Sequence, residues 1–451
     1  MTSISKRKNQ QEHIPAEDLE TPKLPKREKI EGTKESNKVR IIILLGYSGY
    51  GYHGIQINNP LKTIEGDVVA VLKKLGYLKT NNIDAEHLCI ARAARTDKGV
   101  HTLRNLISLN LFVDKPLDIS LLKTELNEAL CSQIRVWSVF PAPKYFNPRI
   151  SCESRTYEYL IPSFALLPPK PSCPLFKKMQ KNLSRKLDNE LERNLVYSMN
   201  DLISFWNTVK LKQKEIQEMF DTNKDAFTNP FKGMFYEKPI PAGIVIPPQA
   251  KLKKALKQAE YYCYMNYRIK EDRLKVLQQL LKKYEGRHNF HNFTVTDDST
   301  SPSNYRFIES VTCGTPFVYE NWEWIPVTIK GNSFMLNQIR KMMAHVLMII
   351  RSCAPTGLID KAFDPNITMN ISKSPGHVLL LKDIKFSSYN DSVTDGLEKI
   401  QFDCFEEDIL SLKIKTIYPD IIKLEQKEKL FFSFLSYIDQ HTGHQFDYLF
   451  G

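Results

Sequence analysis

The stretch Ala94–His101, ARTDKGVH, places a single carboxylate between two cations. Asp97 is flanked by Arg95 and Lys98, and a glycine and a histidine follow. An ionised carboxylate in a basic setting can act as a nucleophile or a base on an anionic substrate. Asp-Lys-Gly is also ordinary turn sequence, because Asp caps its own turn and Gly adopts positive φ. Asp97 therefore has a catalytic and a turn-forming interpretation.

A second stretch, SRTYEYLIP, alternates Tyr157 and Tyr159 on one face of an expected strand. Such a face is most often half buried for structural reasons. It can also serve as a platform on which an extruded nucleobase stacks, a contact worth ~1–3 kcal/mol per base. The pattern leaves both interpretations open for Tyr157.

A third stretch, residues 332–352, has the periodicity of a strong helix. Its apolar side is expected to contain Leu336, Ile339, Met343, Val346 and Ile350. At 100° per residue, Arg340 falls with Arg351 on a polar stripe opposite. Arg340 is then either a solvated charge or a fixed partner for an acid across a cleft.

Two motifs raise the question of cofactors and metals. GYSGYGYHGIQ (46–56) is rich in glycine but matches neither the dinucleotide nor the P-loop pattern, so its glycines are expected to let two backbones approach closely. His288 and His291 have the spacing of a zinc pair, yet the interleaved Phe290 and Phe293 favour structural packing. The sequence predicts no nucleotide cofactor and no metal.

The composition indicates a basic protein without disulfides or membrane spans. Lys and Arg total 63 against 51 Asp and Glu, giving a net charge of +12, which suits a polyanion or an anionic membrane. The eight cysteines are scattered without a CxxC pair, as expected for reduced thiols in an intracellular protein. No apolar run approaches the ~18 residues of a membrane span.

The predicted elements give an α+β fold built from two similar halves. Residues 39–143 read as βαββαβ, a ferredoxin-like unit, and residues 144–390 repeat that order around a helical insertion at about 165–270. The two halves are expected to pair edge to edge into one extended antiparallel sheet flanked by helices. Residues 1–38 are predicted to be a disordered tail, and residues 391–451 a C-terminal extension.

These stretches, in this order, resemble the TruA family of tRNA pseudouridine synthases, and within it the eukaryotic multi-site branch of the nucleus and mitochondria. The resemblance covers about residues 39–390 and rests on five motifs: GYSGYGYHGIQ, RAARTDKGVH followed by NLISL, RTYEYL, YEGRHNFHNFT and GNSFMLNQIRKMM. It implies that Asp97 is the catalytic aspartate and that Arg95 holds the displaced nucleotide. It further implies that Tyr157 stacks on the uracil and that Arg340 pairs with the aspartate.

The resemblance also implies an activity, the isomerisation of uridine to pseudouridine in tRNA, without cofactor or metal. Small nuclear and messenger RNA are further candidate substrates, and we expect a monomer that does not bind membranes. The patches SKRK and PKLPKREK are candidate nuclear-import signals, with a solvated tail and a mitochondrial location as alternatives.

Two departures from the family pattern keep a second interpretation open. Thr102-Leu103-Arg104 stands where relatives carry small residues, and Val378 where they carry glycine. Bulk at these positions could alter site choice or lower the rate. The alternative is therefore a catalytically weak paralogue that acts mainly as a tRNA-binding or chaperone protein.

Overall fold

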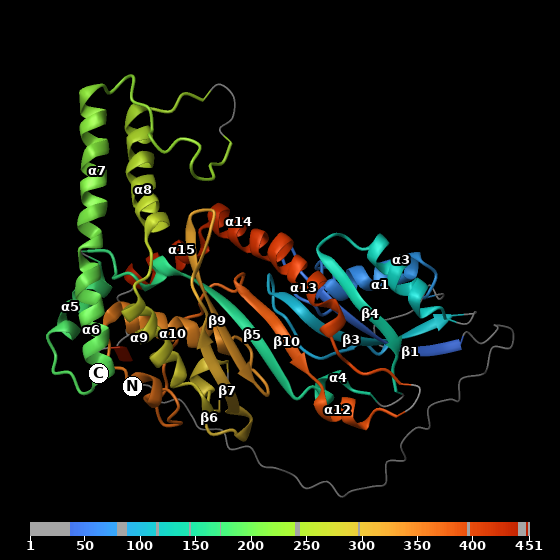
Figure 1. The fold of residues 1–451 in the computed structure, drawn as a ribbon. Coiled ribbons are helices and arrows are strands. Elements are labelled where there is room, and N and C mark those ends of the chain that lie inside the picture. The colour runs from blue at the N-terminus through green and yellow to red at the C-terminus, as the bar shows by residue number, and fades with distance from the viewer. Residues whose placement is uncertain are drawn as a thin grey trace, which may run out of the picture. The chain divides into compact units, whose positions relative to one another are not determined.

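The computed structural model describes residues 37–78, 88–113, 117–143, 146–171, 173–239, 244–295, 298–394, 397–440 and 448–449. Most of the predicted tail, with both basic patches, lies outside the described residues. Asn37 and Lys38, which were assigned to that tail, instead begin the first strand. Figure 1 shows the arrangement of the elements.

The first half has the predicted βαββαβ order. Its elements are β1 (Asn37–Tyr47), α1 (Ile64–Lys74), β2 (Ala91–Arg92), β3 (His101–Val113), α3 (Ile119–Ala129) and β4 (Ile134–Pro141). The strands are ordered β4-β1-β3, with β2 paired to β3. The prediction of a ferredoxin-like first half is confirmed.

The second half repeats this order with additions. Its elements are α4 (Pro148–Ser151), β5 (Ser154–Pro162), η1 (Ser163–Leu166), α9 (Glu271–Lys282), β6 (Gly286–Asn289), η2 (His291–Phe293), η3 (Pro302–Asn304), β7 (Tyr305–Cys313), β8 (Phe317–Tyr319), β9 (Trp322–Gly331), α10 (Gln338–Ser352), α11 (Leu358–Lys361) and β10 (Leu379–Lys385). The strand order is β10-β5-β9-β7-β6, with β8 on β9. One sheet of ten strands results.

The two halves join through β3 and β10, and this pair is parallel. Leu380 pairs with His101 and Leu381 with Thr102, whereas the other named strand pairs are antiparallel. The sheet is therefore mostly antiparallel, with one parallel seam that the sequence did not indicate. Farther along β3, its residues Ile107 and Ser108 pair with β2. The loop 93–100 runs between these two pairings.

Where the structure describes the insertion, it contains the helices α5 (Pro174–Leu183), α6 (Glu190–Ile203), α7 (Phe205–Thr222) and α8 (Pro248–Asn266). Helices α7 and α8 pack side by side and project from the sheet (Figure 1). They have a small core of their own, which includes Ile216, Phe220, Phe227, Leu252 and Ala255. These helices lie within the range predicted for the insertion.

The C-terminal region forms a layer of helices that packs against the sheet. It contains α12 (Ser387–Ser392), η4 (Asp403–Phe405), α13 (Glu406–Leu412), a π-helical turn η5 (Lys413–Ile417), α14 (Tyr418–Glu428) and α15 (Leu430–Gln440). Leu412 and Ile421 share one buried cluster with Leu44 of β1. Ile43, the residue of β1 before Leu44, belongs to a different buried cluster, which contains residues of α1 and α3. Because β1 is covered on both faces, its sequence is a continuous apolar run.

Helix α10 differs from its predicted amphipathic form. Leu336, expected in the core, lies before the helix and is 57% exposed, whereas Arg351 on the expected polar stripe is buried. Arg351 is polar, as predicted for this stripe, but it is paired with a residue of α15 in the interior. Asp439 of α15 accepts two hydrogen bonds from the Arg351 guanidinium.

Candidate active site

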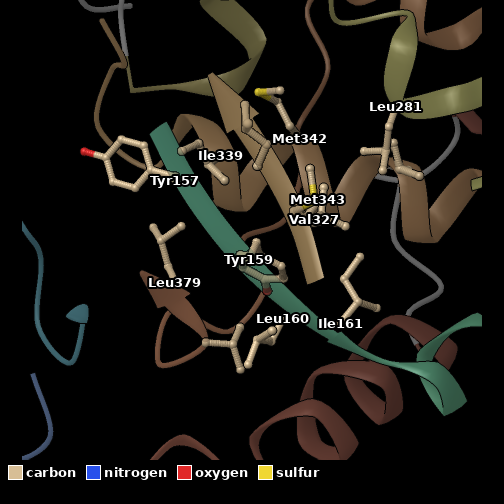
Figure 2. Close-up of a cluster of buried hydrophobic side chains, with 14 of the residues drawn as sticks. Tyr157, Tyr159, Leu160, Ile161, Leu281, Val327, Ile339, Met342, Met343 and Leu379 are labelled. Atoms are coloured by element: carbon tan, nitrogen blue, oxygen red, sulfur yellow. The ribbon is translucent and has the colours of Figure 1, made fainter. Parts of the chain in front are cut away.

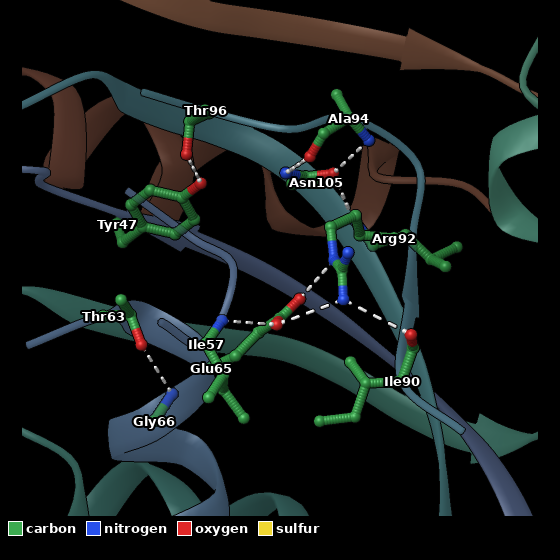
Figure 3. A network of polar contacts seen from close by, with 11 residues as sticks. Tyr47, Ile57, Thr63, Glu65, Gly66, Ile90, Arg92, Ala94, Thr96 and Asn105 are labelled. Atoms are coloured by element: carbon green, nitrogen blue, oxygen red, sulfur yellow. Dashed lines mark hydrogen bonds and ion pairs between the residues drawn. The ribbon is translucent and has the colours of Figure 1, made fainter. Parts of the chain in front are cut away.

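The loop that contains Asp97 is held by hydrogen bonds at two residues that precede Asp97. The Tyr47 hydroxyl is hydrogen-bonded to the Thr96 hydroxyl at 2.6 Å. The Asn105 side chain accepts from the amide of Ala94 at 3.3 Å and donates to its carbonyl at 3.0 Å (Figure 3). Strand β1 and strand β3 thereby fix the backbone on which Asp97 is carried.

A buried ion pair anchors the strand that leads into this loop. Arg92 of β2 contacts Glu65 of α1, with 2.5 Å between Nε and Oε1 (Figure 3). Glu65 also accepts the amide of Ile57. Burial raises the pKa of the Glu65 carboxyl, and the Arg92 charge opposes that rise. The pair connects α1 and β2 to Ile57, which directly follows the glycine-rich loop.

Asp97 forms the turn that its sequence predicts, and its catalytic role stays a prediction. Its carbonyl accepts the amide of Val100, which closes a turn with Gly99 at φ 75°. Its side chain is exposed and makes no hydrogen bond or ion pair with the residues that the structure describes. Arg95 is likewise exposed. The carboxylate on this fixed turn is free to meet a ligand.

Tyr157 lies close enough to Asp97 to be affected by its charge. The ring is 7% exposed and meets Phe334 edge-on, with 5.1 Å between ring centroids. Burial raises the pKa of Tyr157 to about 12; Arg155 opposes this rise and Asp97 adds to it. Figure 2 shows its ring at the edge of a buried cluster, with the hydroxyl directed away from that cluster. The phenol is protonated at neutral pH.

Arg340 is fixed in the first turn of α10 by partners other than Asp97. Its Nε donates to the Ser374 carbonyl at 2.8 Å, and its Nη1 to the Asn337 side chain at 3.2 Å. Asp97 and Arg340, both described by the structure, form no ion pair. A guanidinium has five N–H donors, so three remain for other acceptors.

Arg155 is a residue of this site to which the sequence assigned no role. It is buried at the start of β5, where it donates to the carbonyls of Ala93 at 2.8 Å and Asn332 at 2.7 Å. It therefore links the Asp97 loop to β5 and to the segment before α10. The available signal was its place in the RTYEYL motif, directly before Thr156 and Tyr157.

His101, which directly follows the loop that contains Asp97, connects the glycine-rich loop to His377. Its Nδ1 accepts the amide of Gly49 at 3.1 Å, and its Nε2 donates to the carbonyl of His377 at 2.9 Å. Burial lowers the pKa of His101 to about 4, so the ring is neutral. Next to Gly49, the Ser48 hydroxyl donates to Asp420 of α14 at 2.6 Å. The C-terminal layer thus contacts the glycine-rich loop directly.

Replacing Gly49 with alanine is expected to disturb the Asp97 turn. A Cβ at Gly49 would lie 2.3 Å from the carbonyl oxygen of Val100, so the turn must move. A displacement of about 1 Å can cost about a hundredfold in rate, and we expect that order of loss in turnover. Gly357→Ala is the control, since Gly357 has φ −66° and open space around it. Equal turnover by both variants would contradict this expectation.

The two departures from the family pattern have structural partners. The Thr102 hydroxyl donates to the Leu381 carbonyl, and Arg104 to that of Lys382, both at 3.1 Å across the seam. Arg104 also pairs with Glu406 of α13. Val378 is fully buried. Thr102 and Arg104 thus join the two halves, and Arg104 also joins them to the C-terminal layer.

The two histidines of the possible zinc pair have packing partners. His288 stacks on Phe363 with 4.1 Å between ring centroids and donates to the Glu285 carbonyl. His291 contacts Asn289 and the carbonyl of Ile367. Within the described residues, no group of three or more His, Cys, Asp or Glu side chains could hold a metal ion. The packing interpretation accounts for both rings.

Comparison with known proteins identifies the family. A family model described as tRNA pseudouridine synthase matches residues 280–387. The tRNA pseudouridine synthase 1 of Schizosaccharomyces pombe is 36% identical over 91% of this chain and 85% of its own length. This chain belongs to the TruA-type tRNA pseudouridine synthases. The synthase is accordingly an isomerase.

Other relatives of the synthase extend this comparison. The tRNA pseudouridine synthase 1 of Saccharomyces cerevisiae is 35% identical over 93% of this chain and 72% of its own length. The pseudouridylate synthase 1 homolog of Mus musculus is 28% identical over 94% of this chain and 77% of its own length. The match to the family model includes Arg340 but not Arg95, Asp97 or Tyr157. In the part of the synthase that the structure describes, no helix is long and apolar enough to cross a membrane.

Proposed function

We propose that this synthase converts uridine to pseudouridine in tRNA and that Asp97 is its catalytic carboxylate. The observation that carries this assignment is the Asp97 carboxylate, which has no partner among the described residues and lies on a hydrogen-bonded turn near the buried ring of Tyr157. The fungal relatives, which are named tRNA pseudouridine synthase 1, support tRNA as the substrate.

The proposed reaction exchanges one glycosidic bond for another. The N1–C1′ bond of uridine breaks, the uracil rotates, and C5 bonds to C1′; C5 loses its proton and N1 ends protonated. Nothing is oxidised, and no group comes from another molecule. Asp97 initiates the sequence either by attack on C1′ or by removal of the C2′ proton.

The neighbouring residues have distinct proposed roles. Tyr157 stacks on the uracil and keeps it from leaving, and Arg95 holds the nucleotide displaced from the RNA stack. Arg340 pairs with Asp97 once RNA is bound, using N–H donors that have no acceptor among the residues described by the structure. Extrusion of the target costs a few kcal/mol. Phosphate contacts from the basic surface offset that cost, so binding weakens steeply with salt.

The oligomeric state, the further RNA substrates and the location of the synthase are proposed from its sequence. We propose that it acts as a monomer, that small nuclear and messenger RNAs are additional substrates, and that it works in the nucleus. The basis for the location is the two basic patches, SKRK and PKLPKREK, which lie outside the described residues. A mitochondrial location is the alternative.

A turnover assay separates this function from the alternative of a tRNA-binding chaperone. The purified synthase is incubated with tRNA that carries tritium at C5 of its uridines, and released tritium is counted. Catalysis releases the C5 hydrogen, whereas binding alone does not. Catalytic release supports the proposal; tight binding without release favours the chaperone. Pseudouridine mapping of cellular RNA, with and without the protein, then identifies the substrates.

A further inference from the structure

Asp420 of helix α14 is hydrogen-bonded to the glycine-rich loop, residues 46–56. Its Oδ2 accepts the Ser48 hydroxyl at 2.6 Å. Ser48 is fully buried and Asp420 is half-buried. Burial raises the pKa of the Asp420 carboxyl, and the Ser48 hydrogen bond and the Lys423 charge oppose that rise. This hydrogen bond joins the C-terminal layer to the loop beside the candidate active site.

The Asp420 hydrogen bond determines which donor His101 accepts. Nε2 of His101 faces the carbonyl of His377, which can only accept, so Nε2 carries the proton and Nδ1 is an acceptor. Two donors lie within reach of Nδ1, the Gly49 amide at 3.1 Å and the Ser48 hydroxyl at 3.3 Å. The hydroxyl has one proton, and it is directed to Asp420. Nδ1 is therefore left to the Gly49 amide.

The glycine-rich loop in turn holds the Asp97 turn on both sides of that residue. The Ile55 amide donates to the carbonyl of Thr96 at 3.3 Å. The Gly99 amide donates to the carbonyl of Tyr52 at 3.1 Å. Because these two hydrogen bonds bracket Asp97, a shift of the loop also shifts the backbone that carries the carboxylate.

Helix α14 makes two further contacts around the same site. Glu425 lies 3.2 Å from Nε2 of His377, and both side chains are buried. The carbonyl of His377 is the second partner of His101. The Tyr418 hydroxyl donates at 2.7 Å to Glu158, which directly follows Tyr157 in β5. One helix thus contacts the glycine-rich loop, the segment before β10 and β5.

We propose that Asp420 is a positioning residue of the candidate active site. It orients the Ser48 hydroxyl, keeps His101 available to the glycine-rich loop, and thereby holds Asp97 where its carboxylate meets the target nucleoside. The proposal rests on the proposed function for the role of Asp97, whereas the effect of Asp420 on the loop is independent of it. Neither Ser48 nor Asp420 lies within the residues that match the family model.

The test replaces Asp420 with alanine and with asparagine in the full chain. Asp420→Ala frees the Ser48 hydroxyl to donate to His101, and we expect kcat for tritium release to fall about tenfold with KM unchanged. Asp420→Asn keeps an oxygen that accepts the hydroxyl and should restore kcat to within about twofold of the wild type. Glu428→Ala, at an exposed position on the same helix, is the matched control and should keep the wild-type kcat.

Two further measurements separate positioning from a general loss of stability. Adding Ser48→Ala to Asp420→Ala removes the competing hydroxyl, so this double variant should recover most of the lost kcat. Amide hydrogen exchange, followed by mass spectrometry, reports on the loop directly. In Asp420→Ala, exchange should become faster in residues 46–56 and 96–101 and stay as in the wild type in α9.

The proposal is overturned if Asp420→Ala keeps the wild-type kcat, or if Asp420→Asn is as slow as Asp420→Ala. It is also overturned if exchange rises throughout the chain, which is the result of a purely structural role, or if the double variant recovers nothing. If the wild type releases no tritium, the proposed function fails. Exchange in residues 46–56 and 96–101 then decides alone whether Asp420 positions the loop.

Discussion

Replacing Asp97 with alanine is expected to abolish pseudouridine formation while tRNA affinity stays within about twofold of the wild type. The carboxylate is exposed and unpaired among the described residues, so its removal leaves no partner unsatisfied and the fold should be unchanged. A catalytic carboxylate is worth at least about a thousandfold in rate, and its loss should appear in single-turnover tritium release.

Two further variants make this result specific. Asp97→Asn keeps the shape but removes the charge, and we expect it to be as inactive as alanine. Asp225→Ala changes an exposed acid in the connection between α7 and α8 and should leave the rate unchanged. Product formation by a clean Asp97→Ala preparation at a rate near that of the wild type would refute the assignment of Asp97.

The second large effect concerns stability. Arg351 and Asp439 are both buried, with N–O distances of 2.6 and 2.7 Å, and Arg351 also donates to the Leu167 carbonyl. Asp439→Ala leaves the guanidinium buried without a counter-charge, which costs about 3–5 kcal/mol of unfolding free energy. Urea unfolding of the variant and the wild type measures the difference.

A double variant separates the charge from the packing. Arg351→Met with Asp439→Leu removes both charges and keeps apolar volume, so it should recover most of the lost stability. Glu271→Ala breaks an exposed pair with Lys275 and should leave the unfolding midpoint unchanged. If Asp439→Ala unfolds like the wild type, α15 is not anchored by this pair.

Local patterns in the sequence were enough to predict the order of the elements and the position of the Asp97 loop. Strand and helix periodicities are local, so 39–143 and the second half could be assigned without knowing what they pack against. The turn at Asp97 was also encoded locally, in Asp-Lys-Gly. The five motifs added the family and the candidate roles of Arg95, Asp97, Tyr157 and Arg340.

Which surfaces of these elements contact one another became known from the three-dimensional packing. Periodicity shows on which side of a helix a residue lies, but it does not identify the neighbour. Arg351 could be assigned to a polar stripe, but its partner Asp439 of α15 could not be predicted. The parallel seam at His101 and Thr102 joins segments about 280 residues apart, and Arg155 acts through distant backbone carbonyls. Such contacts depend on how whole helices and strands pack together. A short stretch of sequence does not contain that information.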